Sequence, residues 1–212
     1  YSLKWVGKDS PILINDERYA PAGVLAPKSA ADLAFTMHML SHLKETGICA
    51  IVEFPGVLYR GGAEMQIREY LIQNNYVDTV IQLPANLFYG VGIATCIFVL
   101  KRGKKKDGNV LLIDASNEFV KNGNKNLLEQ RNIDKIVNAY INRKDEQYFC
   151  KLVSNEEIIA NECNLTVQRY VEQEDTREKI DIKAVNKDIE KVVEKVNGLR
   201  DKVNEFIEEK EG

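Results

Sequence analysis

Short apolar runs alternate with segments of helical periodicity along the first half of the chain. Ser29 and Asp32 have capping-box spacing, with Asp in place of Glu, and apolar positions then recur every three or four residues. The strand-like runs are short and rich in β-branched residues, which is typical of buried strands. The pattern predicts helices over residues 29–46 and 63–75 and strands over residues 48–54 and 77–83. Such alternation predicts an α/β fold with parallel strands joined by right-handed crossovers.

Two adjacent aromatic residues, Phe88 and Tyr89, lie in a glycine-broken loop between two strand-like runs. We expect this loop to present the two rings at a sheet edge, where a flat ligand could stack. The run from Ala94 to Lys101 follows too soon for a crossover helix, so it is expected to pair antiparallel. Residues 109–115 then add another edge strand.

The last third of the chain is predicted to be helical. Two short helices are expected over residues 132–143 and 154–162, the second opened by a capping box from Ser154 to Glu157. The final segment has apolar residues spaced alternately by three and four, an a/d heptad pattern formed by Ile182, Val185, Ile189, Val192, Val196, Leu199, Val203 and Phe206. This pattern predicts a helix about 37 Å long that packs against another helix. If the heptads pair with a second copy, the β-branched a positions favour a two-stranded coil.

Composition narrows the class of protein. The net charge of -3 gives no overall attraction to nucleic acid, so any DNA contact must come from a local patch or a partner. Four cysteines without a C-x-x-C pair predict reduced, buried thiols in a cytosolic protein. Apolar runs are too short for a membrane span, and His38 and His42 lack the acidic residue of a zinc-protease motif, so neither a membrane nor a metal is expected.

Five sequence blocks resemble, in their joint order and spacing, the modification subunit of bacterial type I restriction-modification systems. They are Ala31 to Phe35 (ADLAF), Gly56 to Glu64 (GVLYRGGAE), Leu83 to Phe88 (LPANLF), Gly92 to Thr95 (GIAT) and Ile113 to Ser116 (IDAS). The resemblance runs from Tyr1 to about Val171. Members of that family are S-adenosylmethionine-dependent DNA adenine-N6 methyltransferases. The resemblance implies the C-terminal half of a Rossmann-like methyltransferase sheet. This sheet would be mixed, with an antiparallel edge strand, and would be followed by helices that include the heptad helix.

The resemblance also implies three parts and a missing front half. The parts are residues 1–120 from the methyltransferase domain, a helical extension over 121–172 and a coiled-coil-like docking helix over 173–212. Small departures are Ala94, where Pro is usual, and both ends of the segment from Cys163 to Tyr170. The family's catalytic motif is Asn-Pro-Pro-Tyr or Asn-Pro-Pro-Phe, and Tyr1 resembles only its last residue. We therefore expect this chain to be cut from a longer one that also carries the glycine-rich cofactor loop.

The resemblance assigns roles at the target base. Tyr1 would stack on one face of an extruded adenine, and Phe88, with Tyr89 in reserve, on the other. The alternative for Phe88 is a core plug under the sheet edge. Arg60, followed by two glycines before a helix, could contact a phosphate or the DNA backbone, or could belong to a plain turn. The dense basic cluster is either a DNA contact or a solvated turn, and consists of Lys101, Arg102, Lys104, Lys105 and Lys106.

Two functional hypotheses follow. In the first, the chain is a fragment of a DNA adenine methyltransferase subunit: the parent uses S-adenosylmethionine, and the fragment alone binds no cofactor and is inactive. In the second, it is a non-enzymatic assembly module acting through the heptad helix. The expected partners are DNA, the specificity and restriction subunits and a second modification subunit, in the cytoplasm and without a membrane. Partner contact is assigned to the heptad positions Ile189, Val192, Val196, Leu199 and Val203.

Overall fold

The computed structural model describes residues 3–7, 10–104, 108–174 and 181–211, which fall into two units that we treat separately. Unit 1 extends to Gln173, and unit 2 begins at Glu174. The helices of unit 1 are α1 (Asp32–Ser41), α2 (Ala63–Gln73), α3 (Gln130–Asn142) and α4 (Asn155–Ala160), with 3-10 turns η2 (Leu13–Asn15), η3 (Pro55–Leu58) and η4 (Val167–Arg169). Its strands are β1 (Ile48–Glu53), β2 (Val77–Gln82), β3 (Cys96–Lys101), β4 (Asn109–Asp114), β5 (Val120–Asn122), β6 (Lys125–Leu127) and β7 (Cys150–Ser154). Unit 2 contains α5 (Ile182–Glu211).

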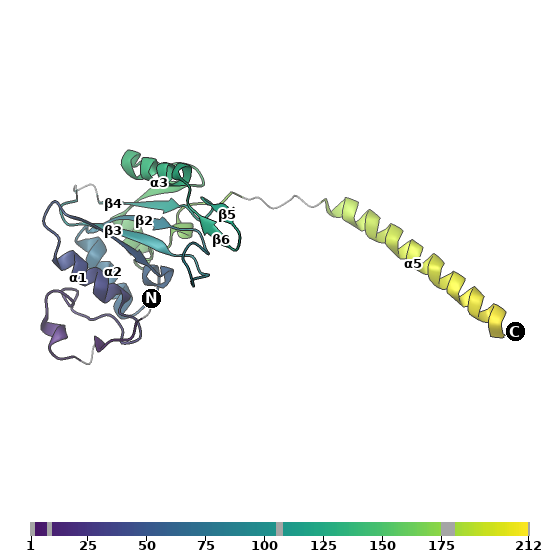
Figure 1. Ribbon diagram of the computed structural model, residues 1–212, viewed down its shortest axis with the longest axis horizontal. Helices are drawn as coiled ribbons and strands as arrows, with labels where there is room; N and C mark the ends of the chain where they lie inside the picture. Colours follow the sequence, from purple (N-terminus) through teal and green to yellow (C-terminus); the bar gives the residue numbers. More distant parts are fainter. Residues whose placement is uncertain (1–2, 8–9, 105–107, 175–180, 212) are drawn as a thin grey trace. The chain divides into compact units, whose positions relative to one another are not determined.

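Five strands form one mixed sheet in the order β1-β3-β2-β4-β7 (Figure 1). β2 and β4 are parallel, whereas β3 is antiparallel to both of its neighbours, β1 and β2. The predicted antiparallel pairing of the run after the aromatic loop is therefore confirmed. The expected position of this run at an edge of the sheet was wrong, because β3 lies between β1 and β2 and Phe98 is completely buried. β4 is also interior, since β7 pairs with it antiparallel and provides the antiparallel edge strand.

Helices cover both faces of this sheet (Figure 1). On one face α1, α2 and α4 pack on the larger apolar core, which includes Met37, Leu71 and Ile158. On the other face α3 contributes Ile136 to a smaller core. All four cysteines are buried and free, as the sequence predicted. Burial raises the pKa of each thiol, that of Cys96 to about 12, so these groups stay protonated at neutral pH.

The start of α1 differs from the prediction, whereas the start of α4 agrees with it. The predicted start of the first helix at Ser29 was wrong: α1 begins at Asp32, and its N-cap, Ala31, makes no side-chain cap bond. The Ala31 N–H instead donates to the Leu3 carbonyl at 2.9 Å. The predicted N-cap of α4 is confirmed, because the Ser154 hydroxyl accepts from the Glu157 N–H at 3.1 Å, which is one of the two bonds of a capping box. β7 and the β5–β6 hairpin were not predicted.

A buried arginine joins α2 to two distant segments. Arg68 is 1% exposed, and its guanidinium donates to the carbonyls of Val57 and Cys163 at 3.0 and 2.8 Å. Burial lowers the pKa of Arg68 to about 10, which still leaves it charged at neutral pH. The side chain thus satisfies two carbonyls with charge-assisted bonds and fixes the loop after β1 against the segment after α4.

Candidate functional site

The carboxyl ends of three strands meet at one edge of the sheet. β1, β2 and β4 run in the same direction, so Glu53, Gln82 and Asp114 lie along this edge, and β3 begins there at Cys96. In α/β sheets ligands bind beyond the carboxyl ends of parallel strands. We call this edge, with the loops that follow β1 and β2, the carboxyl edge.

The aromatic loop rises from the carboxyl edge on a fixed base. The Leu83 backbone N–H and the Gln82 side-chain amide both donate to the Thr95 carbonyl, at 2.8 and 3.1 Å. These bonds hold the two ends of the loop together. Phe88 is 37% exposed, whereas Tyr89 is 94% exposed. Phe88 is therefore partly anchored and still presents part of its ring, which excludes the fully buried core plug. Tyr89 is held by almost no packing.

A small hairpin that the sequence analysis missed braces this loop. In β6 the Asn126 side chain donates to the Ala85 carbonyl at 2.7 Å, and the Asn126 N–H donates to the Asn86 carbonyl at 3.0 Å. Next to it, the Lys125 ammonium donates to the Phe88 carbonyl at 3.1 Å. The available signal was the Gly123-Asn124 pair: Asn122 pairs with Lys125, so these two residues form the turn, and Gly123 has a φ of 60°.

Arg60 lies in the loop between β1 and α2, also beyond the carboxyl edge. Its guanidinium sits over the Phe54 ring at 5.1 Å and lies 3.9 Å from a Glu64 carboxylate oxygen. Gly56 makes this stack possible, because a Cβ there would come within 2.6 Å of Phe54 and 2.8 Å of Arg60. Gly62 has a φ of 66°, so the turn into α2 needs glycine. Arg60 is thus held in a defined, half-exposed position beside the edge.

Two buried carboxyl groups accompany these residues. Glu53 is 2% exposed and accepts a hydrogen bond from the Thr36 hydroxyl at 2.8 Å. Burial, together with the charge of Asp32, raises the pKa of Glu53 to about 7 against the effect of the Thr36 bond. Burial also raises the pKa of Glu64. The carboxyl edge therefore holds at least one acid that is partly protonated at neutral pH.

Comparison with known proteins shows the family to which the chain belongs. The family model described as N-6 DNA Methylase matches residues 1–179. The chain belongs to the N-6 DNA methylase family. It is 45% identical over 209 residues to the type I restriction enzyme MpnII methylase subunit of Mycoplasma pneumoniae, covering 99% of this chain and 38% of that protein. It is 34% identical to the MjaVII methylase subunit of Methanocaldococcus jannaschii, over 88% of this chain and 33% of that protein.

A solved structure agrees with these relatives. The type I restriction-modification methyltransferase subunit of Streptococcus thermophilus superposes with a TM-score of 0.76 and 46% identity, over 81% of this chain and 36% of that one. This N-6 DNA methylase chain therefore spans less than two fifths of the length of these relatives.

The predicted basic cluster lies at the opposite edge of the methylase sheet from Phe88. β3 runs away from the carboxyl edge to Lys101, about 17–20 Å at 3.2–3.4 Å per residue. There Lys101 pairs with the buried Asp78 at 3.2 Å, and Arg102 and Lys104 donate to backbone carbonyls at 3.1 and 2.8 Å. Lys105 and Lys106 lie outside the described residues. DNA contact by this cluster stays a prediction, and the structure does not bring it near the aromatic loop.

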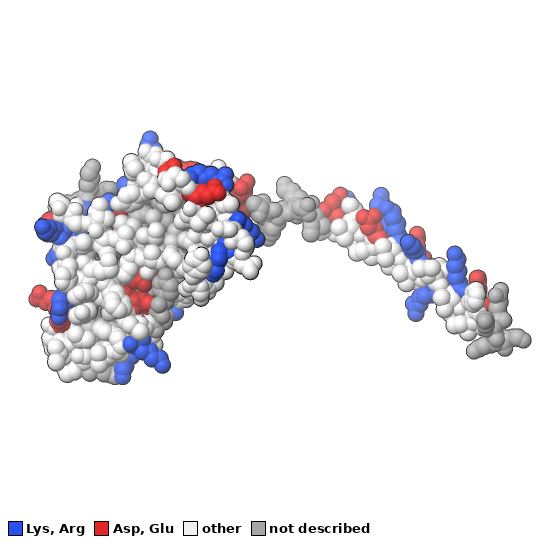
Figure 2. All heavy atoms as spheres, in the orientation of Figure 1, with Lys and Arg blue, Asp and Glu red and all other residues white. Residues whose placement is uncertain are grey.

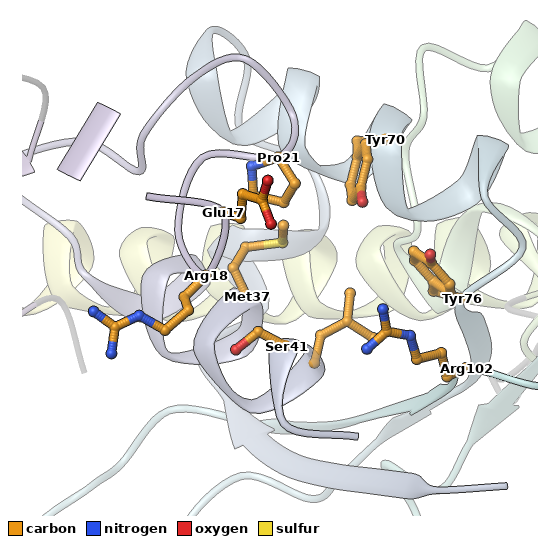
Figure 3. Close-up of a pocket in the computed structure, with 9 residues that line it drawn as sticks. Glu17, Arg18, Pro21, Met37, Ser41, Tyr70, Tyr76 and Arg102 are labelled. Atoms are coloured by element: carbon orange, nitrogen blue, oxygen red, sulfur yellow. The ribbon is translucent and has the colours of Figure 1, made fainter. Parts of the chain in front are cut away.

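A pocket of about 470 Å³ also lies at this opposite edge (Figure 3). Tyr70, Tyr76 and Arg102 line one side of it, and Glu17 and Pro21 contribute from the irregular N-terminal segment. This pocket is not lined by the aromatic loop, Arg60 or Glu53.

The remaining predicted site residues divide between the two units. Tyr1 lies outside the described residues. The five partner-binding positions all lie on α5 and are 48–61% exposed, namely Ile189, Val192, Val196, Leu199 and Val203. Figure 2 shows an uncharged stripe along α5 with charged side chains beside it. No described helix is long and apolar enough to cross a membrane, and the described residues contain no group of three His, Cys, Asp or Glu side chains suited to a metal.

Proposed function

We propose that this chain forms the target-base side of a type I DNA adenine-N6 methyltransferase, with Phe88 as one jaw of a clamp around an extruded adenine. The observation that carries the proposal is the braced, half-exposed Phe88 at the carboxyl edge, which also holds Arg60. Its parent would act in the cytoplasm on DNA, together with specificity and restriction subunits and a second modification subunit. The relatives named above are methylase subunits of type I restriction enzymes, which supports a parent protein that works as one subunit of a larger enzyme.

The chemistry explains why a braced aromatic is needed. The exocyclic amine of adenine is a weak nucleophile, since its lone pair is delocalised into the ring, so the base must be held out of the duplex in a fixed orientation. Stacking on one face of the base contributes about 1–3 kcal/mol. Tyr1 would stack on the opposite face. Arg60, fixed over Phe54, is placed to contact a phosphate of the distorted strand.

S-adenosylmethionine would supply the methyl group when bound to the parent protein. The cofactor loop that the family resemblance implies would belong to the rest of the parent protein, so the described residues would supply only part of the cofactor site. β1 pairs with β3 on one side, and no described strand pairs with its other side. We propose that the rest of the parent's sheet, with the cofactor loop, adds to this free side. The isolated chain should then show no binding of S-adenosylmethionine by titration calorimetry, and micromolar affinity would contradict this account.

The base clamp is tested in the full-length parent assembled with its specificity subunit. Phe88→Ala should lower kcat/KM for methyl transfer to a DNA duplex about 5- to 150-fold, the equivalent of one stacking contact. Phe88→Trp should keep most of the activity, because it restores a ring. Tyr148→Ala, which removes an exposed ring from the turn before β7, is the matched control. Activity of Phe88→Ala within twofold of the parent would refute the clamp.

A second function rests on a separate observation, the exposed apolar stripe of α5. We propose that this stripe docks the chain on the specificity subunit. Val196→Asp and Leu199→Asp should each abolish co-purification with that subunit, because a carboxylate cannot be buried in a helix interface without a partner. Asn197→Asp, which adds the same charge one position outside the stripe, should leave the complex intact. Persistence of the complex in both stripe variants would exclude the docking role.

A further inference from the structure

The flanks of the α5 stripe carry an uneven charge. When Ile182 is placed at position a, the e and g positions that flank the stripe include Lys195, Arg200 and Lys202. Between Lys195 and Lys202 no acidic residue occupies an e or g position. The described part of the chain gives none of the three cations an ion pair, whereas the acidic Asp188 near the start of α5 is paired with Lys191 at 3.1 Å.

The acidic side chains of the same stretch lie on the outer positions of the helix. Glu194 and Asp201 are at position f, and Glu205 is at c, away from the stripe. The hollow between the apolar side chains and the flank, about 340 Å³, is lined by Val196, Leu199, Arg200, Val203 and Asn204. A partner helix packed against this face of α5 would therefore have the flanking cations of α5 beside its own e and g positions.

These charges oppose pairing of two copies in the parallel, two-stranded arrangement that the a positions favour. In that arrangement position g of one helix faces position e of the next heptad on the other, so Lys195 would face Arg200 of its partner twice. Like charges at such positions select against self-pairing and in favour of a complementary chain.

We propose that α5 docks onto a helix of a different protein whose e and g positions are acidic, with Lys195, Arg200 and Lys202 as the residues that select it. This proposal rests on the docking role of α5 given above and adds the chemistry of the partner. The apolar stripe supplies affinity, and the three cations supply the choice of partner.

The test uses the whole 212-residue chain and two designed helical peptides of about four heptads. Both peptides carry Ile at a and Leu at d, and they differ only in having Glu or Lys at every e and g position. By fluorescence anisotropy the Glu peptide should bind at least about ten-fold more tightly than the Lys peptide, and the ratio should shrink at high salt because the pairs are solvent-exposed.

Two triple variants separate the flank from overall charge. Lys195→Glu with Arg200→Glu and Lys202→Glu should reverse the preference, so that the Lys peptide binds more tightly. The matched control, Lys183→Glu with Lys187→Glu and Lys191→Glu, makes the same change in net charge at outer positions and should leave the preference unchanged. Circular dichroism confirms that α5 remains helical in both.

The proposal is overturned if the two peptides bind equally, if neither binds, or if sedimentation shows that α5 forms a dimer of this chain, parallel or antiparallel. Failure here is distinguishable from failure of the docking role. If Val196→Asp still disrupts the complex with the specificity subunit while the peptides show no preference, docking stands and the charge rule falls. Neither peptide experiment depends on methyl transfer, so the base clamp is tested independently.

Discussion

Glu53 gives unit 1 a pH-dependent stability that can be calculated from its surroundings. The residue is 2% exposed at the end of β1, and burial raises the pKa of its carboxyl from 4.5 to about 7. Between these two values the folded state holds a proton that the unfolded state has lost. Stability therefore falls as the pH rises through this window, and it levels off above pH 7.

The size of the effect follows from the same two pKa values. At about 1.4 kcal/mol per pH unit, this rise corresponds to about 3 kcal/mol of stability lost between pH 4.5 and about 7. Glu53→Gln carries no charge at any pH and keeps an oxygen that can accept the Thr36 hydrogen bond. We expect the variant to be about 3 kcal/mol more stable than the native chain at pH 8 and nearly equal to it at pH 4.5.

Urea unfolding followed by the fluorescence of Trp5 measures this difference. Trp5 is the only tryptophan, and its indole N–H donates to the Pro27 carbonyl at 2.8 Å, so its signal reports on unit 1. Glu172 is an exposed acid that follows η4, near the end of unit 1. Glu172→Gln serves as the control and should leave the curve of stability against pH unchanged. The reasoning is refuted if Glu53→Gln and the native chain differ by a constant amount from pH 5 to pH 8, or if the variant is the less stable at pH 8.

Three further predictions concern the supports of the fold and of the site. Arg68→Met should cost about 2–4 kcal/mol, because two buried carbonyls lose their donors, and urea unfolding measures the loss. Asn126→Ala should free the aromatic loop without unfolding the sheet: faster hydrogen exchange at residues 85–91, with an unchanged melting temperature, is the expected result, and unchanged exchange would contradict the bracing role. Gly198→Ala should raise the helix content of α5 by circular dichroism, since alanine is about 1 kcal/mol better than glycine in a helix interior, without weakening co-purification with the specificity subunit.

The sequence predicted the elements that are marked by periodicity and missed those that depend on distant contacts. β1, α2 and β2 follow from local patterns, and the antiparallel β3 follows from the length of the loop before it. The placement of β3 inside the sheet does not, because pairing with β1 on its second side is a contact across 43 residues, from Glu53 to Cys96. β7 was missed for a similar reason: only two of its five residues, Cys150 and Val153, are buried, and it is fixed by β4 rather than by its own pattern.

Candidate site residues show the same division between local pattern and tertiary context. A glycine-broken loop with two aromatics predicted exposure correctly, but only the structure separates Phe88, partly buried and braced by β6, from the freely exposed Tyr89. The basic cluster also depends on tertiary context. A run of cations in the sequence does not reveal that Arg102 and Lys104 donate to backbone carbonyls of distant segments.

The two ends of the parallel strands differ in their surroundings, and the difference follows from chain direction. At the amino edge the parallel strands begin and the helices before them end, so carbonyls of α1 and its turn point outward without internal partners. Cations stabilise such carbonyls, and Arg102 donates to Leu43 there. At the carboxyl edge the next helices begin, so the unpaired backbone groups there are N–H donors, which a cation cannot satisfy. Phe88 and Arg60 lie at that edge, each held by its neighbours and each partly exposed.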